Sequence, residues 1–222
     1  MREEAFTCFG RAAQVSSPWP HAMAFAALGA AEILEAWPDH PGALALLDGA
    51  DSVIGRPPAA EEWPWPQPRL SYANAAITEA LIVAGDKLGR AQVLSNGLRM
   101  LGWLLRVETR NGHLSVVPTK GWSLGEARPA FDQQPIEVAA LADACARAYA
   151  LTGDGSWADG VELALSWFLG ANDAGTSLHD PVSGGGCDGL ERLGRNENQG
   201  AESTLALLST SQQGRRILVP SR

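Results

Sequence analysis

The feature that most restricts the fold of this chain is a series of apolar stretches with helical spacing, separated by Gly and Pro. In AMAFAALGAAEILEAW, the side chains of Phe25, Leu28 and Ile33 fall on one stripe of a helix. Convincing strands are absent, and HLSVVPT (113–119) favours only a short extended piece or small hairpin. The pattern predicts an all-α fold with helices at 22–37, 42–55, 71–85, 90–108, 134–153, 157–172 and 200–210.

These helices are predicted to pair into hairpins, because two parts of the chain resemble each other weakly. The segment ITEALIVAGDK…GWLL (77–105) is similar to LADACARAYALTGDG…SWFL (141–169). In each, a helix ends at Gly-Asp and the chain returns on a second helix. We therefore expect about three hairpins and a closing helix in one domain, an α/α hairpin array over 1–222, with a flexible tail at 211–222.

The connections between the helices fall into two classes of length. In an up–down array, the short turns lie on one face and the long loops on the other. Loops this long in a compact domain are usually functional or disordered, and these contain Trp, His, Asp and Gly turns rather than linker composition. The long-loop face is therefore the predicted functional surface. The short turns are 38–41, 85–89 and 153–156, and the long loops are 55–70, 107–132 and 171–199.

Composition narrows the class of function. The 222 residues include 45% hydrophobic and 19% charged residues, enough apolar surface to bury a core. Lys and Arg number 17 against 25 Asp and Glu, and this acidic balance disfavours a nucleic-acid partner. Three dispersed cysteines suit a reducing cytosol, so we expect a cytoplasmic protein. No signal peptide is predicted, because MREEAFTCFG contains no apolar h-region. No membrane span is predicted, because no apolar run reaches roughly 20 residues.

Four acidic residues near predicted helix starts are candidates for chemistry. Asp132 precedes QQPIE and is either an N-cap or a site acid. Glu137 follows in the same helix, either as an exposed partner of the helix dipole or as a buried acid with a raised pKa. Glu197 belongs either to a solvated loop or to a site. Glu202 either caps the last helix or lines the same hollow.

A polar, uncharged ligand such as a sugar would suit the other residues of these loops. Amides and carboxylates pair with hydroxyls, and Trp rings cover the C–H face of a sugar. The alternative is that the tryptophans only cover the helical core and that the NENQ segment is a solvated loop. The predicted substrate-binding residues are Glu62, Trp63, Trp65, Tyr72, Asn74, Trp122, Gln133, Gln134, His179, Asp180, Asn196, Asn198 and Glu202.

A metal or phosphate site is not expected. His179 and Asp180 with Cys187 and Asp188 fit no standard zinc spacing. The Gly184–Gly186 run has no preceding strand and no following Lys-Ser/Thr, as a phosphate loop would require. We therefore predict no metal and no cofactor.

Three motifs together resemble a known group of proteins. WPWPQPRLSYANAAITEAL, FDQQPIEVAAL and NENQGAESTLALL are similar to helical domains found alone or behind bacterial glycosyltransferases of the GT-B type. The hairpin pattern resembles the (α/α) toroids of the six-hairpin glycosidase superfamily, from about residue 22 onward. The resemblance implies a carbohydrate-directed toroid with catalytic acids at Asp132, Glu137 and Glu197. With about three and a half hairpins, it also implies a shortened array or one lacking N-terminal hairpins.

Three functions remain open at this point. A glycoside hydrolase would pair Glu137 or Asp132 with Glu197, about 6.5–9.5 Å apart for inversion or about 5–5.5 Å for retention. A non-catalytic sugar-binding module, working beside a partner glycosyltransferase, would need no such pair. A helical scaffold for protein partners would expose an apolar patch, which could also form a homodimer.

Overall fold

The computed structural model describes residues 2–218, and these form eight helices and two short hairpins. The predicted all-α class is confirmed. The helices are α1 (Arg2–Ala12), α2 (Pro20–Ala36), α3 (Pro41–Ile54), α4 (Asn74–Lys87), α5 (Ala91–Glu108), α6 (Pro135–Thr152), α7 (Gly155–Phe168) and α8 (Ala201–Leu218). The strand pairs are β1 (Thr109–Arg110) with β2 (His113–Leu114), and β3 (Gly189–Glu191) with β4 (Gly194–Asn196).

The predicted helices differ from the observed ones mainly at their ends. Helix α4 begins at Asn74 instead of residue 71, and α1 and the β3–β4 hairpin were not predicted. Helix α8 continues to Leu218, so the tail predicted at 211–222 is helical as far as that residue. The rest of that predicted tail, 219–222, lies outside the described residues. A helix expected to end at residue 210 continues because SQQGRRIL still permits helical geometry.

The described chain divides into two compact units, where a single domain was expected. Unit 1 contains residues 2–66 and 76–100, and unit 2 contains residues 67–75 and 101–218. Two compact units can still belong to one evolutionary domain, so the predicted domain boundaries stay a prediction.

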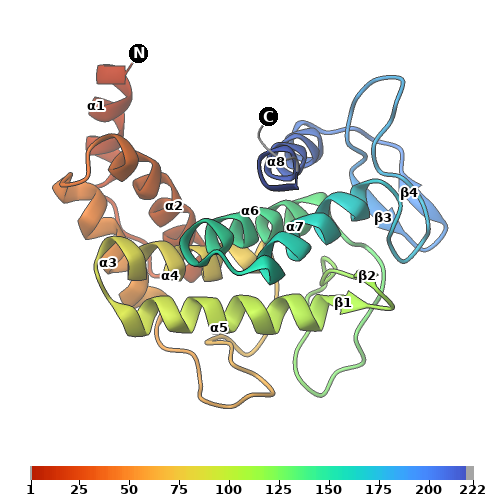
Figure 1. Ribbon diagram of the computed structural model, residues 1–222, viewed down its shortest axis with the longest axis horizontal. Helices are drawn as coiled ribbons and strands as arrows, with labels where there is room; N and C mark the ends of the chain where they lie inside the picture. The colour runs from red at the N-terminus through yellow and green to blue at the C-terminus, as the bar shows by residue number, and fades with distance from the viewer. Residues whose placement is uncertain (1, 219–222) are drawn as a thin grey trace. The chain divides into compact units, whose positions relative to one another are not determined.

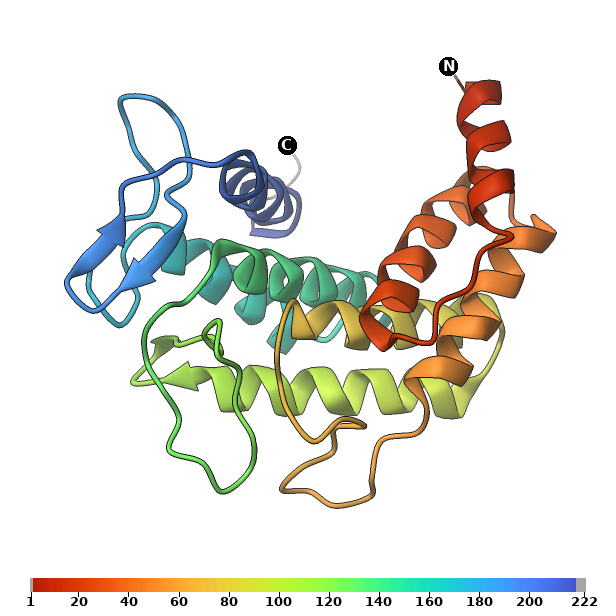
Figure 2. The same cartoon turned by 180° about the vertical axis from the view of Figure 1, so that it is seen from behind.

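Unit 1 consists of close-packed helical pairs. Helices α2 and α3 form an antiparallel hairpin (Figure 2), and both helices contain buried alanines. Helices α4 and α5 approach closely near the turn that joins them, since a Cβ at Gly85 would lie 2.3 Å from the backbone nitrogen of Leu94. A Cβ at Gly97 would lie 2.8 Å from the backbone nitrogen of Ile82. Glycine is therefore required at this contact for steric reasons.

Unit 2 is built on the α6–α7 hairpin, with α8 packed across both helices (Figure 1). Pro135 begins α6, as predicted, because the first helical position needs no N–H donor. Gly153 ends α6 in the left-handed conformation, and the Asp154 carboxylate then caps α7 through the Ser156 N–H at 3.0 Å. The core of the hairpin includes Trp167 and Phe168, both fully buried.

No helix within residues 2–218 combines the length and the apolar character that crossing a bilayer requires.

Candidate functional site

Parts of the long connections meet within unit 2. Leu70 forms an isolated antiparallel bridge with Trp122, and Gln133 forms another with Leu190. These bridges, with the Asp132 N–H donating to the Leu190 carbonyl at 3.2 Å, join residues 67–75, 107–132 and 171–199 around the beginnings of α6 and α8. The expected gathering of long loops therefore occurs for the segments that belong to this unit.

A cluster of four polar side chains lies where these segments meet. Tyr72, with 40% of its surface exposed, donates its hydroxyl to Glu202 Oε2 at 3.3 Å. Glu137 accepts from Asn74, and the fields of Glu202 and Glu137 add to burial in raising the pKa of Tyr72. We call Tyr72, Asn74, Glu137 and Glu202 the acid–tyrosine cluster. All four were predicted as site residues, and the structure brings them together.

Glu137 is the buried member of this cluster, with 5% of its surface exposed. Its Oε1 accepts from the Ala73 N–H at 2.5 Å, and its Oε2 accepts from the Asn74 N–H at 3.2 Å and from Asn74 Nδ2 at 3.1 Å. Burial, with a contribution from the charge of Glu108, raises the pKa of Glu137 to about 8, although these hydrogen bonds act in the opposite direction. The carboxyl is thus held in one orientation by N–H donors from Ala73 and Asn74.

A second buried acid, Glu108, was missed from the sequence. It is 1% exposed, its Oε1 accepts from the Val117 N–H at 2.9 Å, and burial raises its pKa to about 7. Arg128 opposes that shift electrostatically and donates to the carbonyls of Val107 and Ser115. The signal that could have revealed Glu108 is its helical phase, since it follows the buried Leu101 and Leu104 on one stripe of α5.

The QQ pair at the start of α6 separates into two environments. Gln133 is fully buried, and its Oε1 accepts from Trp167 Nε1 at 2.9 Å while its Nε2 donates to Asp173 Oδ2 at 2.5 Å. Gln134 is the half-buried N-cap residue of α6 and makes no side-chain capping bond. Asp132 is exposed and has a positive φ of 69°, so it precedes the N-cap instead of serving as one. The side chain of Gln133 thus links the start of α6 to Trp167 and Asp173 through hydrogen bonds within the protein.

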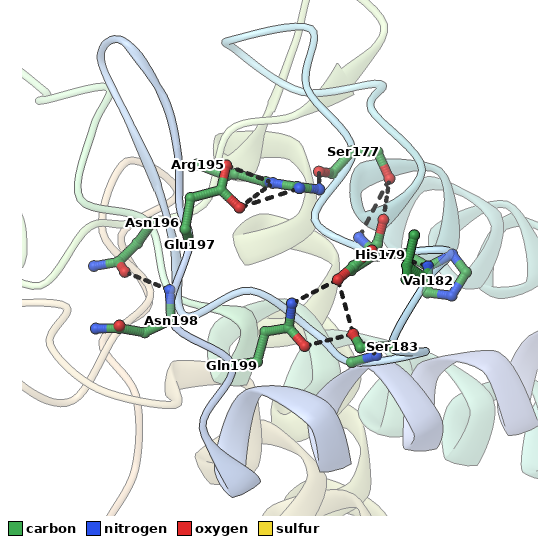
Figure 3. Close-up of polar contacts among 11 residues, drawn as sticks. Ser177, His179, Val182, Ser183, Arg195, Asn196, Glu197, Asn198 and Gln199 are labelled. Carbon is green, nitrogen blue, oxygen red and sulfur yellow. Dashed lines mark hydrogen bonds and ion pairs between the residues drawn. The ribbon is translucent and has the colours of Figure 1, made fainter.

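The loop before β3 is organised around Asp180. Its carboxylate accepts from the Val182 N–H at 2.9 Å, from Ser183 Oγ at 2.9 Å and from Gln199 Nε2 at 2.8 Å. These bonds lower the pKa of Asp180 to about 2. Ser183 Oγ also lies 2.6 Å from Gln199 Oε1, so its single proton is shared between two acceptors, and Figure 3 shows Ser183 and Gln199 side by side. Gln199 was not among the predicted residues, although it lies within the NENQ segment.

The rest of the NENQ segment is a surface network. Glu197 pairs with Arg195, whose Nη2 lies 3.1 Å from Glu197 Oε2, and the Glu197 side chain is 74% exposed (Figure 3). Asn196 Oδ1 accepts from the Asn198 N–H at 3.0 Å, which makes a local turn. Glu197 is therefore a solvated, ion-paired acid, unlike the buried Glu137. The Asn198 side chain is exposed, while Asn196 and His179 are half-buried.

The tryptophans predicted to stack on a sugar lie in different units. Glu62, Trp63 and Trp65 belong to unit 1, where Glu62 is exposed and Trp65 is 1% exposed. A ring as deeply buried as Trp65 packs in the core and presents no free face for stacking. In unit 2, Trp122 is half-buried and donates its Nε1 to the Glu126 carbonyl at 3.0 Å.

No known protein-family model matches this chain, and no curated protein sequence is significantly similar to it. The geometry of unit 2 is therefore the basis for a functional proposal.

Proposed function

We propose that unit 2 binds an oligosaccharide at the acid–tyrosine cluster. The observation that carries the proposal is the bond between the exposed Tyr72 and Glu202, because it places an exposed aromatic ring beside a carboxylate. A sugar ring needs both, a flat apolar surface for its C–H groups and acceptors for its hydroxyls. The exposed amide of Asn198 and the half-buried amide of Gln134, near the beginnings of α8 and α6, would supply further hydroxyl contacts.

The wider setting proposed for this site is an α/α hairpin array of the six-hairpin glycosidase-like type. Support comes from the paired helices within each unit and from the resemblance of three motifs to helical domains of glycosyltransferase systems. In this proposal the protein is cytoplasmic and works beside a glycosyltransferase or as a homodimer. Binding needs no second catalytic acid, which fits the exposed ion pair of Glu197 with Arg195.

Binding is tested by titrating the chain with a panel of oligosaccharides in a calorimeter. We expect Tyr72→Ala and Glu202→Gln to weaken binding about tenfold or more, equivalent to about 1.4 kcal/mol each. Asp159→Asn is the matched control, because Asp159 is an exposed acid on α7 outside the cluster. The proposal fails if no oligosaccharide binds, or if both cluster variants bind as tightly as the parent chain.

A second candidate function is glycoside hydrolysis, and the buried Glu137 favours it. A carboxyl with a pKa of about 8 carries the proton that a general acid gives to a leaving glycosidic oxygen. In this version Glu202 takes the role of the second carboxylate, in place of the ion-paired Glu197. Glu137→Gln should then abolish release of reducing sugar. A parent chain that binds oligosaccharide without turnover would exclude hydrolysis and leave the binding function.

A further inference from the structure

Unit 2 contains a pocket of about 360 Å³ that none of the predicted motifs explains. One wall is a face of α8 that includes Leu207, Leu208 and Ser211, and the opposite wall includes Leu169 and His179. The volume falls within the roughly 300–1,000 Å³ typical of small-molecule sites. His179, which was predicted to belong to a sugar site, is one of the residues that line this pocket.

The interior of the pocket is largely apolar. Leu207 is buried, whereas Leu208 and Leu169 are 48% and 60% exposed although both are large aliphatic side chains. Such side chains gain free energy when a hydrocarbon group displaces water from them. The walls therefore favour a ligand with an apolar body.

The charge in the pocket has one sign. Arg215, on the last turns of α8, lines the same pocket as His179, and no lining residue within the described chain is Asp or Glu. The chain as a whole carries a net charge of −8, so an acid-free lining around an arginine is a local exception. Guanidinium groups bind carboxylates through paired N–H donors.

The wall that carries His179 is preorganised. The Asp180 carboxylate holds the Val182 N–H and Ser183, and the His179 backbone pairs with Gly186 in an isolated bridge. Gly186 in turn donates to Thr204 Oγ1 at 3.2 Å, which ties this loop to α8 (Figure 3 shows its His179, Val182 and Ser183). A loop held in this way keeps the pocket open at a low cost in conformational entropy.

We infer that this pocket binds an organic anion with a short hydrocarbon body, of the class of medium-chain carboxylates. The hydrocarbon chain lies against Leu169, Leu207 and Leu208, and the carboxylate pairs with Arg215. The inference is independent of the proposed saccharide site, because no residue of the acid–tyrosine cluster lines this pocket.

The test is calorimetric titration of the full chain with acetate, hexanoate and octanoate. We expect affinity to rise roughly fourfold for each added CH₂ that becomes buried. Arg215→Gln should weaken octanoate binding about tenfold or more. Arg216→Gln is the matched control, since its neighbouring, exposed guanidinium does not line the pocket, and it should leave octanoate binding unchanged.

A second variant tests the apolar wall. Leu208→Ser should reduce the dependence of affinity on chain length, and the exposure of Leu208 allows the fold to accept the change. The inference is overturned if octanoate does not bind, if its affinity equals that of acetate, or if the two arginine variants lose affinity equally.

Discussion

A single oxygen of Glu137 holds both the backbone and the side chain of Asn74. Glu137 Oε2 lies 3.2 Å from the Asn74 nitrogen and 3.1 Å from Asn74 Nδ2. Asn74 Oδ1 in turn accepts from the Ser71 N–H at 2.8 Å. Asn74 therefore uses its side-chain polar atoms inside the protein and positions the segment that carries Tyr72, although the sequence predicted it to contact a ligand directly.

Removal of the Glu137 carboxyl should destabilise the fold. Glu137→Ala leaves the N–H groups of Ala73 and Asn74 buried without this acceptor, and we expect a loss of about 2–5 kcal/mol in the free energy of unfolding. Glu202→Ala, at an exposed position of the same cluster, should change it by no more than about 0.5 kcal/mol. Urea unfolding monitored by circular dichroism measures both. Equal effects would show that Glu137 is not needed to hold this segment.

The buried Glu108 should make stability depend on pH. Its pKa rises from 4.5 to about 7 on folding, so between those values the folded state retains a proton that the unfolded state releases. The contribution of Glu108 to the free energy of unfolding is therefore largest below about pH 4.5. It declines as the pH rises to about 7, by up to about 3 kcal/mol in total.

Glu108→Gln is the variant that tests this pH dependence. Its amide oxygen can still accept the Val117 N–H, but it carries no charge, so its profile of unfolding free energy between pH 4.5 and 8 should be flatter than that of the parent. Parallel profiles would mean that Glu108 is not titrating in this range.

The adjacent residues Gln133 and Gln134 allow a matched comparison, because only the Gln133 side chain is bonded to both Trp167 and Asp173. Gln133→Ala removes the acceptor of Trp167 and a donor to Asp173, and should lower the free energy of unfolding by about 2–4 kcal/mol. Gln134→Ala should have an effect within about 0.5 kcal/mol, because its side chain makes no capping bond. Chemical denaturation measures the free energy of unfolding of both variants. Similar losses would contradict the role of the Gln133 side chain in holding the loops together.

Close packing of α6 against α7 predicts another contrast, between two glycines of α7. A Cβ at Gly160 would lie 2.7 Å from Cys145 Sγ, so Gly160→Ala should destabilise by about 1–3 kcal/mol. Gly155 has open space around its Cβ position, and Gly155→Ala should stay within about 0.5 kcal/mol of the parent or gain stability. Thermal unfolding compares them directly. A Gly160→Ala variant as stable as the parent would mean that the helices can separate at little cost.

The candidate site was predictable in part. Glu137 and Glu202 lie in the first turns of α6 and α8, and the sequence pattern predicts where these helices begin. Both could therefore be identified as candidate site residues. Their environments could not be predicted, because burial depends on which distant segments cover a side chain. Glu197 lies in an equally polar sequence, yet it is exposed and paired with Arg195. The sequence left Trp65 open between stacking on a sugar and packing in the core, and the structure buries it.

The sequence by itself determined the helices and their hairpin turns, because apolar spacing, Pro at helix starts and Gly at helix ends act within a few residues. Only the tertiary structure decided that Tyr72 meets Glu202, 130 positions further along the chain, and that Glu108 and Glu137 are buried with raised pKa values. Such contacts and desolvation arise from the packing of whole elements, which local sequence patterns do not encode.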